Sequence, residues 1–335
     1  MHKITLIPGD GIGPEIIESV KQIFKAAEIP VEWEEANAGI VSLEKGDELI
    51  PQSLIDSVNR NKVALKGPIT TPVGKGFKSV NVQLRQIFDL YQNVRPCKST
   101  PGVASKFDDV DTVLFRENTE GLYAGLELYD DRLEMADSIA RVTKKGSERI
   151  IKASFEYARK FGRKKVTLVH KANILKWIGK IFLDAGAEVS KAYPDIEMND
   201  RIIDNMCMQL VLRPHEYDVI VTTNLFGDIL SDLCAGLVGG LGLVSGANIG
   251  DDIAIFEAVH GSAPDIAGQD KANPTAVIRS AILMLKHLKL NSFAEEIDAA
   301  LDLTLKNPQL CTADLGGPLG TSAFTEAVIS NLGRK

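Results

Sequence analysis

The sequence predicts an α/β protein, and three features of the chain support this class. Short apolar runs typical of strands alternate with longer segments in which apolar residues recur at helical spacing. The 335 residues are 44% hydrophobic and 25% charged, which is typical of a globular protein. This length is large for one compact core, so we expect two lobes or one domain with a large insertion, and a cleft between lobes would be the default site.

The first element is expected to be a strand at residues 3–8 that turns directly into a helix. The run KITLIP is followed by GDGIGP and then by apolar residues at helical spacing: Ile16, Ile17, Val20, Ile23 and Phe24. Gly9, Gly11 and Gly13 stand where a dinucleotide-binding fingerprint would lie, but its third glycine would fall on Pro14. We therefore interpret the segment as a tight strand-to-helix turn with a proline near the helix start.

The alternation continues to the end of the chain. Strand-like segments are expected at 63–73, 111–118, 164–171 and 217–224, and a further apolar segment at 254–268. Helices are expected at 79–91, 147–161, around Trp177 to Phe182, and at 201–212, 228–238, 274–288 and 324–332. Residues 233–250 carry no charge but are glycine-rich and too weakly apolar for a membrane span of ~20 residues. We interpret them as a buried helix and turn.

Charge and cysteine usage exclude several classes of protein. The formal net charge is −7 and no basic stripe is visible, so nucleic acid and anionic membranes are not expected partners. Cys97, Cys207, Cys234 and Cys311 are scattered without a C-x-x-C spacing, which indicates neither a disulfide framework nor a thiolate zinc site. This cysteine usage favours a reducing cytoplasm. No secretory signal is visible at the start of the sequence.

Two aspartates in NLFGDILSD suggest a metal site. Asp228 and Asp232 stand four residues apart on a predicted helix and therefore share a face. Because the neighbouring Ile229, Leu230 and Leu233 predict a largely buried helix, we expect a cation near the two carboxylates. Oxygen ligands without histidine or cysteine favour Mg²⁺ or Mn²⁺. The alternative is a solvated polar stripe.

Three arginines and two residues after strands suggest a polyanionic substrate and proton transfer. Arg85, Arg95 and Arg116 lie at the ends or edges of apolar elements, and each could grip a carboxylate with two hydrogen bonds. Any one of them alone is more often a structural ion pair, but three in an acidic protein favour a small polyanion. Lys171 would have its ammonium form destabilised near a metal and arginines, which favours use as a base, and Tyr123 could donate a proton.

At these residues the chain resembles the isocitrate/3-isopropylmalate dehydrogenase family. The motifs GDGIGPE, FDLYQNVRP, RENTEGLY, VHKAN, NLFGDILSD, HGSAPDIAG and TADLGG carry the resemblance over nearly the whole chain. It implies a twisted mixed sheet in two lobes and a dinucleotide site that is not a Rossmann fold. The implied domains are 1–98 with 251–335, which binds the dinucleotide, and 99–250, which carries metal, substrate and dimer contacts.

The resemblance also implies roles for individual residues in a homodimer with shared active sites. Asp228 and Asp232 would bind Mg²⁺ or Mn²⁺ from one subunit, while Asp204, Lys171 and Asn173 arrive from the other. Arg85, Arg95, Arg116 and Tyr123 match the family's substrate positions. The NAD-binding positions would be Ile69, Thr70, His260, Gly261, Ser262, Ala263, Pro264, Asp265, Ile266 and Asn273. Taken alone, the loop 260–268 could equally be an ordinary turn.

Substrate and cofactor preference follow from two short segments. Ser79, Asn81 and Arg85 fit the S-x-N-x-x-L-R pattern of isocitrate enzymes, so we expect NAD-dependent oxidation and decarboxylation of isocitrate to 2-oxoglutarate. Asp265 and Ile266 stand where NADP-using relatives carry a lysine and a tyrosine. Homoisocitrate and, less so, 3-isopropylmalate are alternative substrates, and a catalytically silent regulatory subunit is the alternative from another class.

Overall fold

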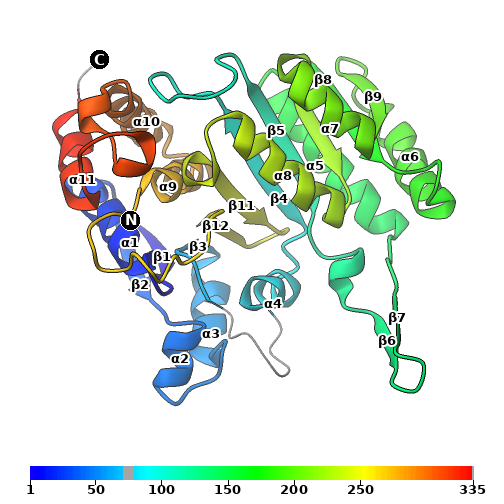
Figure 1. Ribbon diagram of the computed structural model, residues 1–335, viewed down its shortest axis with the longest axis horizontal. Helices are drawn as coiled ribbons and strands as arrows, with labels where there is room; N and C mark the ends of the chain where they lie inside the picture. The colour runs from blue at the N-terminus through cyan, green and yellow to red at the C-terminus, as the bar shows by residue number, and fades with distance from the viewer. Residues whose placement is uncertain (71–78, 334–335) are drawn as a thin grey trace. The chain divides into compact units, whose positions relative to one another are not determined.

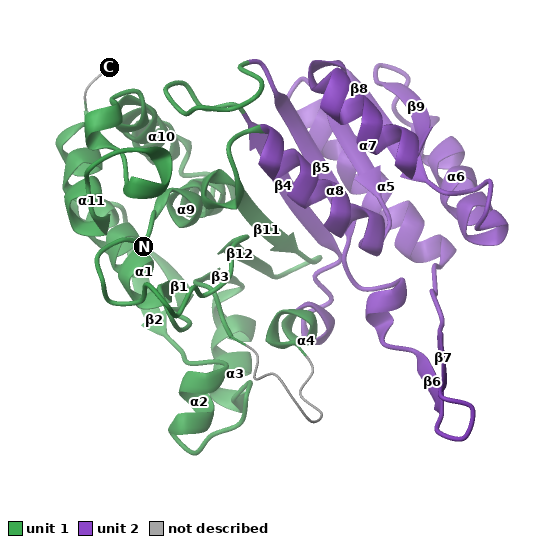
Figure 2. Ribbon diagram, in the orientation of Figure 1, with its two compact units in different colours: residues 1–84, 99–108, 238–335 green, residues 85–98, 109–237 purple. Residues whose placement is uncertain are grey.

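The structure is a computed structural model that describes residues 1–70 and 79–333, and it divides into two compact units (Figure 2). Unit 1 comprises Met1–Leu84, Ser99–Asp108 and Val238–Lys335, and unit 2 comprises Arg85–Lys98 and Asp109–Leu237. Each unit contains its own strands and helices. The functional roles assigned to the two domains above remain predictions.

The described residues of unit 1 form five strands in the order β2-β1-β3-β12-β11 (Figure 1). β1 pairs in parallel with β2 and β3 on its two sides, and β3 pairs in parallel with β12. The β11–β12 pair is antiparallel, which makes the sheet mixed. The strands are β1 (His2–Ile7), β2 (Val31–Glu35), β3 (Val63–Lys66), β11 (Ser245–Ile249) and β12 (Ala254–Ala258).

The helices of unit 1 pack on these strands and on one another. α9 packs on β11 and β12 and against α1 and α10, and α11 packs on α1 and α10, whereas α3 packs on β1 and β3. The Pro14 ring lies in the first turn of α1, where a missing N–H costs no helical hydrogen bond. The helices are α1 (Gly13–Ala26), α2 (Ile40–Glu44), α3 (Gln52–Asn61), α9 (Thr275–His287), α10 (Asn291–Leu305) and α11 (Thr321–Ser330).

Unit 2 contains the strand order β4-β5-β10-β8-β9. β5, β10, β8 and β9 are mutually parallel, and β4 pairs antiparallel with β5. All four parallel strands therefore end at the same edge. The strands are β4 (Gln92–Lys98), β5 (Asp111–Glu117), β8 (Lys165–His170), β9 (Glu197–Ile202) and β10 (Val219–Thr222). A separate hairpin consists of β6 (Glu127–Asp130) and β7 (Met135–Ser138).

The helices of unit 2 form two pairs. α5 and α6 pack together on one face of the strands, and α7 and α8 pack together on the other (Figure 1). Thr143 caps α5 by accepting a hydrogen bond from the Gly146 N–H at 3.0 Å. The helices are α5 (Lys144–Lys160), α6 (Lys176–Ser190), α7 (Ile203–Leu212) and α8 (Asn224–Leu237), and α4 (Val80–Ile87) precedes β4.

The α/β class, the mixed sheet and the tight turn after β1 are confirmed, but several predicted elements need correction. Residues 233–250 form the end of α8, a short 3-10 turn and then the strand β11, so they are more than a buried helix and turn. The helix predicted at 79–91 ends at Ile87 because Asp89 adopts a left-handed conformation (φ 45°). The strand predicted at 63–73 ends at Lys66, and residues 71–73 lie outside the described residues.

Two of the predicted helices expose large apolar side chains, and on α8 this departs from the largely buried helix that was predicted. Trp177 is 79% exposed at the start of α6, whereas Phe182 is fully buried. On α8, Leu230 is fully buried but Ile229 is 52% exposed, so this helix is buried on one face only. Within residues 1–70 and 79–333, no helix is both long and apolar enough to cross a membrane.

Candidate active site

The carboxyl ends of the parallel strands in unit 2 bring four predicted site residues to one edge. Arg116 is the next-to-last residue of β5, and Lys171 follows β8 directly. Asp204 follows β9 in the first turn of α7, and β10 leads into α8, which carries Asp228. Because these strands are parallel, their ends share an edge, which is the usual place for ligands in open α/β sheets.

Arg116, Tyr123 and Asp228 form one hydrogen-bonded cluster, the unit 2 cluster. The Arg116 guanidinium donates to one carboxylate oxygen of Asp228, and the Tyr123 hydroxyl donates to the other. The guanidinium also lies 5.1 Å from the centroid of the Tyr123 ring. Gly227 permits this approach, since a Cβ there would lie 2.5 Å from Arg116 Cγ.

The charges and the burial of this cluster shift the pKa values of its three members. Burial, together with the nearby charges of Arg85 and Arg95, lowers the pKa of Arg116 to about 10, although Asp228 acts in the other direction. Burial pushes the pKa of Asp228 upward, but Arg116, the Tyr123 hydroxyl and Arg95 outweigh it and lower that pKa. Burial and then Asp228 raise the pKa of Tyr123. Asp228 is therefore a carboxylate and Tyr123 a phenol at neutral pH.

Arg95 joins the cluster from β4, and not from the end or edge of an apolar element as expected. The side chain is buried, and its charge is satisfied by Asn93 Oδ1 at 2.8 Å and Ser231 Oγ at 3.2 Å. It lies 3.9 Å from a carboxylate oxygen of Asp232. The positive charges of Arg85 and Arg95 both lower the pKa of Arg116, so the three predicted arginines lie close to one another.

Lys171 and Asp204 form a pair of their own. Lys171 Nζ donates to Asp204 Oδ1 at 2.6 Å, and this hydrogen bond lowers the pKa of Asp204. Asn173 is exposed in the turn between β8 and α6. Among the described residues of one chain, no three acidic, histidine or cysteine side chains are arranged to hold a metal ion.

A second group of predicted residues, the unit 1 cluster, lies where three loops of unit 1 meet. Thr70 donates from its backbone N–H and its hydroxyl to the Asp10 carboxylate, and the hydroxyls of Thr70 and Ser262 lie 2.6 Å apart. The Ile12 N–H donates to the Ser262 carbonyl at 2.8 Å. Ile69 packs beside this group against Gly39.

Two glycines of the loop 260–268 are exposed and have no close neighbours. A Cβ built on Gly261 or Gly268 would meet nothing within 4 Å. His260 Nε2 is buried and has no hydrogen-bond partner among the described residues, and burial lowers the pKa of this imidazole. Asn273 Nδ2 donates to Asp314 at 3.0 Å. The lowered pKa leaves His260 a neutral imidazole at neutral pH.

The helix predicted to select the substrate is α4. Ser79 directly precedes it, and Asn81 and Arg85 lie on it. The amide oxygen of Asn81 is buried without a hydrogen-bond partner among the described residues. As an acceptor, this oxygen can pair only with a hydrogen-bond donor. The remainder of the segment GPITTPVGKG after Thr70 lies outside the described residues.

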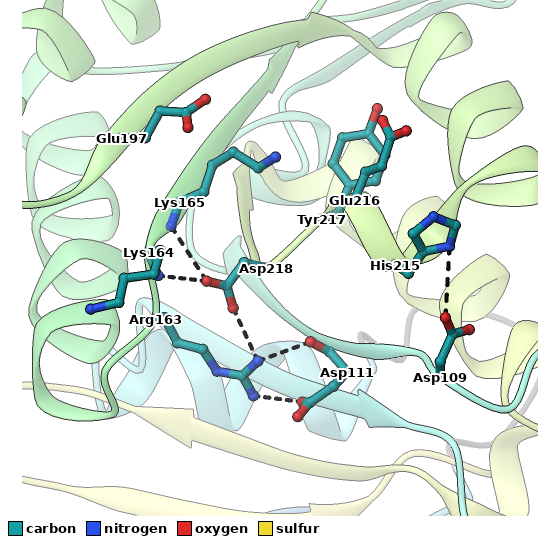
Figure 3. A pocket seen from close by; sticks show the side chains of 10 residues that line it. All are labelled: Asp109, Asp111, Arg163, Lys164, Lys165, Glu197, His215, Glu216, Tyr217 and Asp218. Atoms are coloured by element: carbon teal, nitrogen blue, oxygen red, sulfur yellow. Dashed lines mark hydrogen bonds and ion pairs between the residues drawn. The ribbon is translucent and has the colours of Figure 1, made fainter.

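A pocket of about 390 Å³ lies at the opposite edge of the unit 2 strands (Figure 3). Its wall includes Asp111 and Lys165, the first residues of β5 and β8, and Asp218, which precedes β10. Arg163 donates to both Asp111 and Asp218, as Figure 3 shows. The predicted site residues that the structure describes all lie elsewhere, and the ion pairs of Arg163 with Asp111 and Asp218 join the starts of neighbouring strands.

Several residues for which the sequence predicted no role bind the predicted ones. Asn224 Oδ1 accepts from Arg116 Nε at 3.0 Å and Nη2 at 2.8 Å, while its amide nitrogen donates to the Glu120 carbonyl. Ser231 contacts Arg95, and Asp10 holds Thr70. Each of these polar residues stands in a recognisable motif, which is the signal that could have marked it. Their partners lie 60 to 136 residues away along the chain, so the motif alone does not reveal the contact.

The sequence model described as "Isocitrate/isopropylmalate dehydrogenase" matches residues 3–328. The isocitrate dehydrogenase [NAD] subunit 2 of Schizosaccharomyces pombe is 48% identical over 99% of this chain and 88% of its own length. A regulatory subunit of isocitrate dehydrogenase [NAD] from Dictyostelium discoideum is 50% identical over 99% and 92%. Both names describe mitochondrial proteins. The crystal structure of isocitrate dehydrogenase from Methylococcus capsulatus matches with 53% identity and a TM-score of 0.95, covering 99% of each chain.

Proposed function

Because the chain belongs to the isocitrate/isopropylmalate dehydrogenase family, we propose that it is an NAD-dependent isocitrate dehydrogenase that releases CO₂ and forms 2-oxoglutarate. The names of its relatives support the substrate and the cofactor. The observation in the structure that carries the proposal is the convergence of Arg85, Arg95 and Arg116 beside Asp228 and Tyr123. Three cations in an acidic chain suit a tricarboxylate.

The residues of this chain supply binding and proton transfer. The three arginines hold the substrate carboxylates and fix its orientation. Lys171 accepts the proton of the C2 hydroxyl as the hydride leaves C2. After CO₂ departs, Tyr123 donates a proton to carbon, for which its raised pKa keeps the phenol protonated at neutral pH.

Asp228 and Asp232, with Asp204, would hold Mg²⁺ or Mn²⁺, because their ligand atoms are all carboxylate oxygens. Such an ion, when bound, polarises the substrate's hydroxyl or carbonyl oxygen. Ile69, Thr70, the residues 260–266 and Asn273 would hold NAD, which supplies the hydride acceptor. The buried His260 Nε2, which has no partner among the described residues, supports this location.

We propose a homodimer with shared sites because the metal-binding residues lie beside exposed apolar side chains. Met208 and Leu212 follow Asp204 at helical spacing on α7 and are exposed, and Ile229 is exposed between Asp228 and Asp232 on α8. Further exposed apolar residues lie in the turn before α6, at the start of α6 and on the hairpin: Ile174, Trp177, Leu128, Tyr129 and Met135. Large exposed apolar areas of this kind are typical of interfaces between subunits.

Mixing of two variants tests the shared site. The single variants Asp204→Ala and Asp228→Asn are each expected to be inactive. In a mixed dimer one site would carry both changes and the other neither, so re-equilibrated mixtures should recover about a quarter of the wild-type activity. No recovery, despite mixed dimers detected by mass, would contradict a shared site.

A substrate panel tests the function. We expect kcat/KM with NAD to rank isocitrate first, homoisocitrate second and 3-isopropylmalate last, since an isopropyl group would leave Ser79 and Asn81 without a polar partner at a cost of ~1–3 kcal/mol. Chelation should abolish turnover, and Mg²⁺ or Mn²⁺ should restore it. A preference for homoisocitrate, or Ser79→Ala/Asn81→Leu without effect on isocitrate, would overturn the substrate assignment.

A regulatory role is the second candidate, because one relative carries that word in its name. The presence of Tyr123, Lys171, three arginines and three aspartates favours a catalytic chain. Turnover by the purified chain alone is the expected result, and its absence would favour the regulatory role. For localisation we propose the reducing cytoplasm, since all four cysteines are free thiols.

A further inference from the structure

The motif GDGIGP follows β1 but does not have the spacing of a dinucleotide phosphate loop, and the structure shows what it contacts instead. A Cβ on Gly9 would lie 1.9 Å from the Pro68 carbonyl oxygen, and one on Gly11 would lie 2.0 Å from the Ser262 carbonyl oxygen. Both glycines have positive φ, 76° and 57°. Glycine is therefore required here because two other backbones approach this turn.

The side chain of Asp10 in this turn bonds to Thr70 in the neighbouring segment. Its carboxylate accepts from the Thr70 N–H at 2.8 Å and from the Thr70 hydroxyl, while its own N–H donates to the Pro68 carbonyl at 3.0 Å. Asp10 thus fixes both ends of the segment 68–70. Hydrogen bonds to an ionised carboxylate are among the stronger ones in proteins.

The hydroxyl of Thr70 also contacts Ser262, which lies 192 residues further along the chain. Because an ionised carboxylate only accepts, the Thr70 hydroxyl proton points to Asp10, and the 2.6 Å contact with Ser262 must use the Ser262 proton. The Ser262 hydroxyl therefore donates to the Thr70 hydroxyl, which in turn donates to the Asp10 carboxylate. Ser262 is also held through its carbonyl by the Ile12 N–H.

We propose that Asp10 is a positioning residue for the cofactor. It holds Thr70 directly and Ser262 through the Thr70 hydroxyl, so that the segments 69–70 and 260–266 have their binding geometry before NAD arrives. A preformed site binds more tightly because less ordering cost falls on the binding step. The inference rests on the proposed function, since those two segments are the proposed NAD site.

The test compares three variants of the full-length chain. Asp10→Ala removes both acceptors, and Asp10→Asn keeps one carbonyl acceptor but turns an amide donor toward the other Thr70 donor. Asp270→Ala is the matched control, because the Asp270 carboxylate likewise accepts from a backbone N–H and a hydroxyl, both of Ser322, at 2.8 Å. It breaks the same kind of contact at the start of α11.

The measurements are the Kd of NAD from a titration without substrate, the KM values of NAD and isocitrate, and amide hydrogen exchange of residues 67–70 and 260–263 without cofactor. We expect Asp10→Ala to weaken NAD binding and raise its KM about tenfold or more, with the KM of isocitrate changed less than about twofold. Asp10→Asn should be intermediate. Exchange should accelerate in both peptides of Asp10→Ala but in neither of Asp270→Ala.

Several outcomes would overturn the inference, and they separate it from the proposed function. If the wild type binds NAD and Asp10→Ala binds it equally well, the positioning role is wrong and the function stands. If Asp270→Ala weakens NAD as much as Asp10→Ala, the effect is a general loss of stability and the inference fails. A wild type that binds no NAD would overturn both.

Discussion

The unit 2 cluster and the unit 1 cluster hold their side chains by different forces. Around Arg116 and Asp228, ionised groups are partly buried and pair with one another. Around Thr70 and Ser262, apart from the carboxylate of Asp10, the contacts are neutral hydrogen bonds and backbone approaches that only glycine permits. The first cluster suits a charged substrate and metal, and the second suits a ligand recognised mainly by its shape.

The largest effect is expected from neutralising the unit 2 cluster at Asp228. Asp228→Asn removes one negative charge beside Arg116 and a proposed metal ligand, so kcat/KM should fall by roughly 10³-fold, about 4 kcal/mol. The matched control is Asp218→Asn, which removes an arginine-paired carboxylate at the opposite edge of the same strands. It should lower Tm but leave kcat within about twofold. Equal losses in both variants would contradict an electrostatic role specific to this cluster.

The next prediction concerns the close approach of the Gly9 backbone to the Pro68 carbonyl in the unit 1 cluster. Gly9→Ala places a Cβ against the Pro68 carbonyl, whereas Gly46→Ala at a similar positive φ meets nothing within 4 Å. Both variants share a backbone strain of about 1 kcal/mol, and Gly9→Ala adds ~1–3 kcal/mol of overpacking. Thermal unfolding measures the difference. Similar Tm values for the two variants would show that the close approach carries no cost.

A smaller effect concerns the one predicted charge in the loop 260–266. Asp265 is exposed and would repel the 2′-phosphate of NADP, so the wild type should prefer NAD. Asp265→Lys/Ile266→Tyr should shift the NAD to NADP ratio of kcat/KM toward NADP by about tenfold or more. Asp252→Lys, an equal charge change at another exposed site of unit 1, should leave the ratio unchanged. A wild type that uses NADP equally well would refute this role of Asp265.

The smallest effect is the pH dependence of His260. Burial lowers the pKa of His260 in the folded chain, so the unfolded chain binds the proton more readily. This group therefore costs no stability above its ordinary pKa of ~6.5 and destabilises the fold as pH falls below it. Between pH 8 and 5.5, the Tm of the wild type should fall more than that of His260→Asn. Parallel Tm profiles would contradict the effect.

Local patterns in the sequence were sufficient for much of the fold. Apolar periodicity predicted β1 and α1, and the turn between them followed from glycine and proline. The strand β9 was not predicted, because its sequence EMNDRI is polar and it lies at the edge of the sheet. The strand β4 was not predicted either, because it contains Arg95 and Pro96. Strands with polar side chains lack the apolar signal on which such predictions depend.

The sequence by itself determined which residue types were available: three arginines, two aspartates one helical turn apart, and a glycine turn that fails the dinucleotide pattern. Only the tertiary structure decided their partners. Asn224 meets Arg116 across 108 residues, and Thr70 meets Ser262 across 192. Such contacts depend on strand order and register, which bring distant segments together, and local periodicity contains no information about which strand lies beside which.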